Sequence, residues 1–494
     1  AKIHFNNETV FSSDFKQFSF YNTQLTSELK LASLKKRLSP QLNSELMKLN
    51  IEKQTFSTDA LNLSLNALRL QTKASTKRLF TDPVINSQLL ISSFNPRLLA
   101  KELAITLPDM ADKKALSQLS AQLNIKGSLK NIDVTNLEFS LDDTNFVGNA
   151  KIKATPDSSI INLIVDNINL DRYLPVPLPA KSSAKATENK TSNTIDEAVL
   201  IPVALLSQIN ADADIKIKKL QIKKTHWTDF KLLAHSKNGL ITIKPLTLTG
   251  YDSKIQSNFS IKASKKMALL SGNIDVQKIK AGKLLSDFID KDKFKGETSL
   301  TGNFTTSGLL LSQLKQNLNG KLNLELKDAT IKGFDLHHQQ KVLDAKLKGN
   351  KVPATPDPEE TKIAKLTASA VIKKGVLHNK DLRASTPLSR IIGKGTVDIA
   401  KEQLNYVATV KFTSSTSLNA ATTFEKMQSV PLDILIRGTF DKPKVRVDFE
   451  KVISGRLKKE LKKHEVKIKE KVKEDIKKEL EKKMGDKLKN LLKF

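Results

Sequence analysis

The chain has 494 residues, a net charge of +30 and a hydrophobic share of only 39%; this length predicts about three domains, and the low apolar share favours an elongated, surface-rich protein over a large compact enzyme. The absence of cysteine excludes disulfides and thiolate chemistry. The positive charge is expected to attract polyanions, but only 5% of the residues are aromatic, which argues against the base stacking used by single-strand binders.

The N-terminal region contains neither a signal peptide nor a spanning segment. No run of about 18 apolar residues occurs anywhere in the chain, and its first residue is Ala1 rather than a methionine. We therefore expect a fragment or processed form whose gene encodes a single apolar anchor helix upstream of Ala1.

Alternation of apolar and polar residues dominates from about residue 60 to 450 and predicts strands with one apolar face. Turn residues such as Asn238-Gly239 and Lys374-Gly375 separate these strands, as in antiparallel sheet. The residues expected on the apolar faces, and therefore candidates for lining a groove, are Ile215, Ile217, Leu322, Leu324, Leu326, Leu404, Tyr406, Val410, Phe412, Leu432, Ile434, Ile436, Val445 and Val447.

Short helices are expected only around residues 116–123 and 284–288, which is too little to cover so many strands. The apolar faces must therefore meet each other in a curled sheet or remain available to a ligand. We predict a mainly β fold with an elongated, curled antiparallel sheet that forms an apolar groove. An ordinary closed sandwich core remains the alternative.

Composition divides the chain into four parts. A Pro-, Ser- and Lys-rich linker at 176–198 is expected to be flexible, and it separates one part of the groove at 1–175 from a second at 199–452. Residues 453–494 predict a basic helical tail with Glu–Lys pairs four residues apart.

The tail is a candidate for binding an anionic membrane surface. A solvated helix and a nucleic-acid arm are the alternatives, and the interleaved glutamates argue against the arm. The candidate membrane contacts are Lys458, Lys462, Lys469, Lys473, Leu488, Leu491, Leu492 and Phe494.

Motifs for catalysis or metal binding are isolated. The pair His337-His338 is interpreted as part of a strand, where the two side chains would point to opposite faces and could not share a metal ion. The stretch 393–396 superficially resembles a phosphate loop but lacks the upstream glycine, and we interpret it as a turn. Ser182 and Lys185 match a bare Ser-x-x-Lys pattern inside the linker. We expect no enzyme activity, no cofactor and no metal.

An ordered series of short motifs occupies the second half of the chain. It includes Leu318-Asn319-Gly320, the stretches 328–336, 374–382 and 393–399, and Asp441-Lys442-Pro443. Leu170-Asp171-Arg172-Tyr173 is a weaker upstream element. In order and spacing the series resembles the AsmA family over about residues 90–455, most specifically over 265–450.

This resemblance implies a protein anchored in the bacterial inner membrane that projects into the periplasm. It implies bridge-like phospholipid transport between the inner and outer membranes, with acyl chains in an apolar groove, in support of outer-membrane assembly and homeostasis. Phospholipid, an anionic membrane surface and other envelope proteins are the expected partners, and nucleic acid is not. Two alternatives remain: a periplasmic scaffold with a closed β core that organises outer-membrane assembly, and a polyanion-binding protein.

Overall fold

The computed structural model describes residues 2–30, 37–154, 157–174, 199–264, 266–289, 292–355, 358–412, 431–440, 442–450, 452, 454, 465–474 and 478. The described strands form a 23-stranded sheet, and the helices are few and short. The mainly β fold is therefore confirmed. The chain divides into two compact units, unit 1 with residues 1–326 and 371–376, and unit 2 with residues 327–370 and 377–494.

The strands of unit 1 begin at the start of the described chain, earlier than the alternation predicted. They are β1 (Lys2–Phe11), β2 (Gln17–Glu28), β3 (Pro40–Asn50), β4 (Thr55–Leu65), β5 (Leu68–Lys77), β6 (Val84–Phe94), β7 (Leu119–Ser128), β8 (Asn131–Leu141), β9 (Thr144–Lys153), β10 (Ser159–Asn169), β11 (Ala211–Ile222), β12 (Thr225–Lys237), β13 (Leu240–Gly250), β14 (Ser253–Ser264), β15 (Met267–Lys280), β16 (Phe294–Ser307) and the first part of β17 (Asn319–Lys332).

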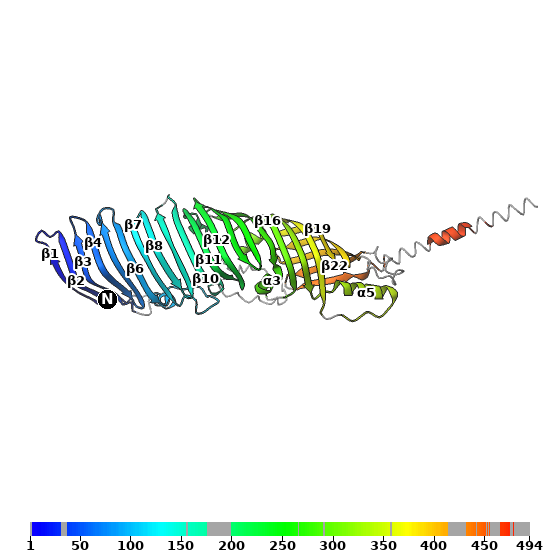
Figure 1. The fold of residues 1–494 in the computed structure, drawn as a ribbon, viewed down its shortest axis with the longest axis horizontal. Helices are drawn as coiled ribbons and strands as arrows, with labels where there is room; N and C mark the ends of the chain where they lie inside the picture. The colour runs from blue at the N-terminus through cyan, green and yellow to red at the C-terminus, as the bar shows by residue number, and fades with distance from the viewer. Residues whose placement is uncertain are drawn as a thin grey trace, which may run out of the picture. The chain divides into compact units, whose positions relative to one another are not determined.

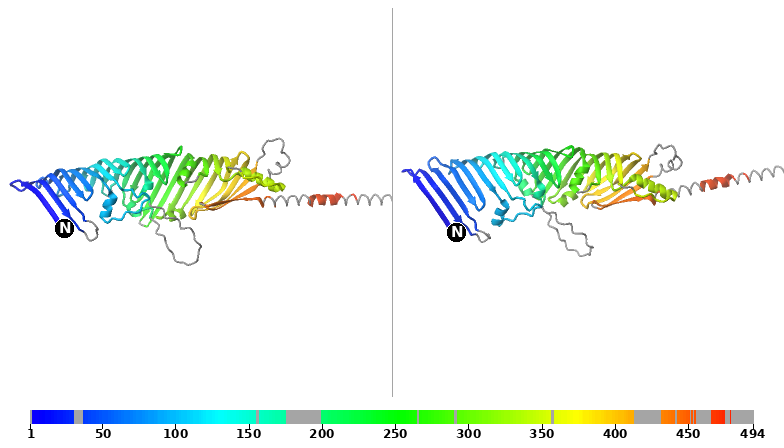
Figure 2. Two further views of the ribbon diagram at one scale, coloured as in Figure 1. Left: turned by 90° about the horizontal axis from the view of Figure 1, so that it is seen from below. Right: turned by 60° about the horizontal axis from the view of Figure 1, so that its bottom comes forward.

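Consecutive strands of unit 1 lie side by side in chain order (Figure 1). From β1 to β10 each strand pairs antiparallel with the next, and so do β11 to β16. The sheet of unit 1 is curved across its strands (Figure 2). The predicted curled antiparallel sheet is thus confirmed for this unit.

One joint in unit 1 departs from the antiparallel prediction, because β10 and β11 pair in parallel. Parallel neighbours cannot be joined by a tight hairpin and require a crossover connection. That connection contains residues 175–198, so the predicted linker at 176–198 lies outside the described residues.

Tight turns join many of the antiparallel strands. Asn238 and Gly239 both have positive φ between β12 and β13, and Lys374 and Gly375 do so between β18 and β19. Two-residue hairpins favour this geometry because its twist matches that of the flanking strands. Both turns are therefore confirmed.

The helices are α1 (Pro96–Glu102), the 3-10 helix η1 (Leu170–Arg172), α2 (Val203–Leu206), α3 (Ala281–Ile289), α4 (Leu311–Gln316) and α5 (Leu336–Lys348). The helix expected at 284–288 is confirmed as α3. The helix expected at 116–123 is wrong, because residues from Leu119 onward form β7. Leucines at 119 and 123 satisfy a period of two as well as a helical period, and pairing with β6 and β8 decided the outcome.

Helix α5 was missed, and with it the assignment of His337 and His338 to a strand is wrong. The Asp335 side chain caps the helix by accepting a hydrogen bond from the amide of His338 at 3.0 Å, and Gly349 ends it with φ of +69°. Asp before a helix and Gly after it are the residues expected at these two positions. These caps were the local signal that could have revealed the helix.

Unit 2 contains the end of β17, most of β18 (Glu360–Lys373) and β19 (Val376–Thr386), and all of β20 (Ser389–Asp398), β21 (Gln403–Phe412), β22 (Leu432–Thr439) and β23 (Pro443–Asp448). Strands β20 to β23 pair antiparallel in sequence order. Helix α5 contributes Leu336 and Leu343 to an apolar core with Val410 and Leu432. One face of these strands is therefore covered by a helix.

Residues 465–474 of the predicted tail form an exposed helix, with Lys469 Nζ 3.0 Å from Glu465 Oε1. Within the described residues, no helix combines the length and apolar character needed to cross a membrane.

Candidate functional site

One face of the sheet of unit 1 carries an uninterrupted row of apolar cross-strand partners. Residues directly opposite each other on neighbouring strands point to the same side of a sheet. From β1 to β12 the row runs through Phe5, Leu25, Leu42, Leu63, Leu70, Ile91, Ala121, Phe139, Phe146, Val165, Ile217 and Phe230. We call the side that carries this row the apolar face of unit 1.

The row passes through the parallel joint without changing sides. Val165 of β10 pairs with Phe146 of the antiparallel neighbour and with Ile217 of the parallel neighbour. Beyond the joint, a second row of cross-strand partners lies beside the first on the same face. It consists of Ala234, Ile243, Phe259, Gly272 and Phe304. The crossover thus preserves the register that keeps one face apolar.

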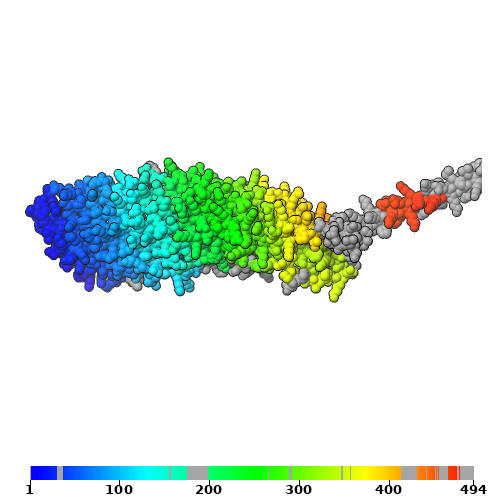
Figure 3. Space-filling view, viewed as in Figure 1, coloured from blue at the N-terminus to red at the C-terminus, as the bar shows by residue number. Residues whose placement is uncertain are grey.

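The opposite face is polar and exposed, as β5 illustrates. Arg69, Gln71 and Lys73 are exposed, whereas Leu70 and the other residues of its parity are half-buried. On the side turned to the viewer, the side chains of neighbouring strands form a continuous surface (Figure 3). A strand with one wet and one dry face is expected of an antiparallel sheet.

Within the described residues, no second layer seals the apolar face in the first part of unit 1. Among the described residues before 200, the buried apolar side chains are Leu38, Ala100, Ala115 and Val165. The rest of the apolar row there is half-buried or, at Phe5, 62% exposed. A closed sandwich would bury most members of such a row, so this face is accessible.

Short helices lie over opposite ends of the apolar face in the middle of unit 1. Val203 of α2 belongs to one apolar cluster with Ala263 of β14, and Leu284 of α3 belongs to another with Ile255 of the same strand. Residues 255 and 263 are separated by eight positions, so at about 3.3 Å per residue the two rims are about 26 Å apart along the strand. The helices form rims, and between them no described element covers the middle of the face.

Aromatic rings line the face between these rims. The rings of Phe259 and Phe304 lie 5.9 Å apart between centroids. They flank Gly272, where an added Cβ would come within 2.7 Å of Phe259 and 3.1 Å of Phe304. Glycine at this position gives the two rings room to lie over the backbone.

Helix α3 is fastened to the strands by Tyr251. Its hydroxyl donates a hydrogen bond to Asp287 Oδ2 at 2.8 Å and accepts one from the amide of His226 at 3.0 Å. Burial, together with the neighbouring Asp287 carboxylate, raises the pKa of Tyr251 to about 12. The neutral phenol is therefore stable in this contact.

The motif Leu170-Asp171-Arg172-Tyr173 fixes the start of the crossover. Asp171 accepts hydrogen bonds from the backbone amides of Lys223 and, at 2.8 Å, Lys224 in the turn after β11. Arg172 forms an ion pair with Asp112 at 2.7 Å. These contacts connect η1, which follows β10, to the turn after β11 and to the loop before β7.

Asp142 completes this cluster. Burial of its carboxyl would raise the pKa, but hydrogen bonds from the amides of Ser117 and Leu116 and from the Tyr173 hydroxyl hold the pKa below its usual value. The carboxylate therefore stays charged near neutral pH. Its role here is structural, because each partner belongs to a loop or to η1.

The predicted groove residues of unit 1 lie on its apolar face. Ile215 pairs with Leu163 and Leu232, and Ile217 follows on the same side. Leu322 approaches Gly302 on this face, and Leu324 and Leu326 share its parity; Leu326 is buried and the other two are half-buried.

Most predicted groove residues of unit 2 occupy a different environment. Val410, Phe412, Leu432 and Ile434 are buried in the core beneath α5, and Ile436 and Val447 pack against that core. For these six the expectation of an open groove is corrected, because a helix that was not predicted covers the strands. Leu404 is half-buried and Val445 is exposed.

Tyr406 explains the glycines at 393 and 395. Gly395 is its cross-strand partner, and an added Cβ at either glycine would come within 3 Å of the Tyr406 ring. The stretch 393–396 therefore lies within β20, and its interpretation as a turn is wrong. Burial, with a contribution from Asp381, raises the pKa of Tyr406 to about 12.

The tail candidates are only partly described. Lys469 and Lys473 lie on the exposed helix at 465–474. Lys458, Lys462, Leu488, Leu491, Leu492 and Phe494 lie outside the described residues. In the described part of the chain, no group of three His, Asp or Glu residues is placed to hold a metal ion.

Comparison with known proteins matches this architecture to one family. The sequence profile of the AsmA family matches residues 2–382, including residues before 90 for which the motifs gave no resemblance. Protein AsmA of Escherichia coli (strain K12) is 18% identical over 362 residues, which cover 71% of this chain. The chain spans 58% of the length of that relative. Because the profile covers more than half of the sequence, the chain belongs to the AsmA family.

Proposed function

We propose that this protein carries phospholipid between the inner and outer membranes, with acyl chains on the apolar face of unit 1 and head groups at its wet edge. The role in the cell is the supply of lipid for outer-membrane assembly. The protein acts without catalysis, in the periplasm, and is held at the inner membrane by an N-terminal anchor.

The uninterrupted apolar row from Phe5 to Phe230 carries this proposal. Burial of apolar surface is non-directional and proportional to area. An acyl chain on a uniform apolar face therefore meets similar contacts at successive strands and can slide without large barriers. An accessible apolar patch of this extent indicates a binding surface.

The membership in the AsmA family gives the cellular context, and the sequence of the tail supports membrane attachment. Residues 456–494 contain 16 Lys and Arg and 8 Asp and Glu. Basic segments near an anionic surface gain about 1 kcal/mol per Lys or Arg. We assign the tail to an anionic membrane surface on this ground.

Adjacent residues of β6 provide a matched test of the lipid path. Ile91 belongs to the apolar row, whereas Leu90 lies on the opposite face and is 41% exposed. A photoreactive amino acid at position 91 should crosslink phospholipid in cells, detected by mass spectrometry, and the same group at position 90 should not. Position 90 is the control for the reactivity of the photoreactive group itself, because both native residues are apolar and exposed to some degree.

Equal labelling at both positions would indicate non-specific contact with lipid. Absence of label at both, in a folded protein, would favour a scaffold whose apolar face is covered by another protein. A polyanion binder would instead show a steep salt dependence of DNA affinity from counterion release.

A further inference from the structure

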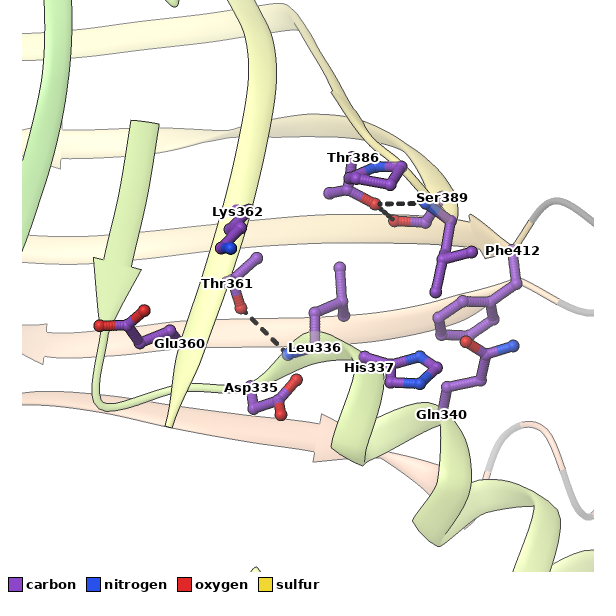
Figure 4. A pocket seen from close by; sticks show the side chains of 12 residues that line it. Asp335, Leu336, His337, Gln340, Glu360, Thr361, Lys362, Thr386, Ser389 and Phe412 are labelled. Carbon is purple, nitrogen blue, oxygen red and sulfur yellow. Dashed lines mark hydrogen bonds between the residues drawn. The ribbon is translucent and has the colours of Figure 1, made fainter. Parts of the chain in front are cut away.

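A separate cavity lies within unit 2, at the N-terminus of α5 (Figure 4). Its volume is about 280 Å³. Leu336, Leu388 and Phe412 form its apolar walls, and Gln340, Thr361 and Ser389 line it with polar side chains.

The side chain of Gln340 has no obvious structural reason to be polar. The residue is only 5% exposed, and its Oε1 is buried and accepts no hydrogen bond from the described residues. In Figure 4 the amide lies beside the ring of Phe412 and near His337. A buried acceptor without a donor destabilises a fold and requires an explanation.

The neighbouring hydroxyl groups are already hydrogen-bonded. Thr361 Oγ1 donates to the carbonyl of Phe334 at 2.6 Å and accepts from the amide of Leu336 at 3.0 Å. The hydroxyls of Thr386 and Ser389 bond to each other at 2.7 Å. A donor taken from one of these hydroxyls would break an existing bond, whereas a ligand hydroxyl in the cavity would donate to Gln340 without that loss.

The charges around the cavity select a neutral donor. Charges of both signs line the cavity, because Lys362 and the positive end of the α5 dipole lie beside the carboxylates of Asp335 and Glu360. A ligand charged with either sign therefore meets repulsion as well as attraction. Gln340 Oε1 offers an acceptor, which an anion without a proton cannot use. A hydroxyl group on an apolar body satisfies these conditions.

We propose that this cavity binds the glycerol hydroxyl of an acylglycerol-type lipid, which donates a hydrogen bond to Gln340 Oε1 while its alkyl part lies against Leu336, Leu388 and Phe412. This inference rests on the proposed function, which supplies the lipid. It adds a head-group subsite to a path that otherwise distinguishes lipids only by apolar area.

The first test needs no substitution. Binding of 1-monooctanoylglycerol to the full chain is measured by calorimetry and compared with its di-O-methyl ether, which keeps the apolar body but has no donor. We expect the ether to bind about tenfold more weakly, because a site built around a hydrogen bond is left with an unpaired group. Equal affinity of the two probes overturns the proposal.

Gln340→Met keeps the length of the side chain and removes the acceptor, and Gln339→Met on the same helix is the matched control outside the cavity. We expect Gln339→Met to retain the tenfold preference for the alcohol and Gln340→Met to lose it. A Gln340→Met protein with the wild-type preference contradicts the assignment.

Two sources of glycerol hydroxyls are separated by competition. Displacement of 1-monooctanoylglycerol by dihexanoylphosphatidylglycerol supports a phospholipid head group, and resistance to it supports a neutral acylglycerol. The crosslink at position 91, measured on the same proteins, separates the two hypotheses. Absence of the crosslink in a protein that keeps Gln340 refutes the lipid path. A crosslink in a protein that binds the alcohol and its ether equally refutes only the subsite.

Discussion

Two leucines that look equivalent in the sequence should respond differently to the same substitution. Leu70 lies in the apolar row of unit 1 between Leu63 and Ile91 and is half-buried. Leu432 is 0% exposed in the core beneath α5. Replacing each by Asp places the same carboxylate on an accessible face and in a sealed core.

The expected costs follow from burial. Full burial of a leucine side chain is worth about 1.5–3 kcal/mol, and an unpaired buried polar group costs about 1–3 kcal/mol more. Leu432→Asp should therefore lose about 4 kcal/mol. Leu70→Asp loses about half of the transfer energy, or about 1 kcal/mol, because its carboxylate remains hydrated. The difference of about 3 kcal/mol corresponds to about two orders of magnitude in an opening equilibrium.

Amide hydrogen exchange read by mass spectrometry measures both sites locally. Peptides of β22 in Leu432→Asp should lose protection by two to three orders of magnitude, and peptides of β5 in Leu70→Asp by about fivefold. Leu70→Asp should also reduce co-purified phospholipid, because an unpaired charge among acyl chains is unfavourable. Gln71→Asp, on the polar face of the same strand, is the control for added charge.

A loss of protection at Leu70 comparable to that at Leu432 would refute this reasoning, since it would mean that a second layer seals the apolar face of unit 1. Normal phospholipid content in a folded Leu70→Asp protein would remove β5 from the lipid path.

Three further predictions address the rim, the crossover and the tail. Tyr251→Phe leaves the Asp287 carboxylate without its phenol donor, so exchange in α3 should rise by about tenfold; unchanged exchange would show that the tyrosine does not fasten the helix. The depressed pKa of Asp142 contributes stability that is present above its unfolded value of about 3.9 and is lost as pH falls through the lower folded value; acid should therefore open residues 110–118 in the wild type, and Asp142→Asn should already be open at neutral pH and show a flatter acid profile. Residues 456–494 should bind anionic vesicles, gain helix and be released by high salt; equal affinity for neutral vesicles would exclude electrostatic attachment.

The candidate site could be predicted in outline. Leu322, Leu324 and Ile215 were identified from alternation, and they lie on the apolar face because the side-chain period of a strand fixes which residues share a side. Gln340 could not be found in this way. A glutamine on an unpredicted helix carries no signal in the sequence, and only the packing around it leaves its oxygen without a donor among the described residues.

Local period and short motifs were enough to predict the class of fold, the apolar side of the strands with clear alternation, and the family. The tertiary structure alone decided what covers each apolar face. Leu70 and Leu432 sit in equally regular strands, yet α5 covers one and nothing described covers the other. Alternation in the sequence predicts which face of a strand is apolar. Whether a helix or a lipid covers that face depends on residues distant in the chain.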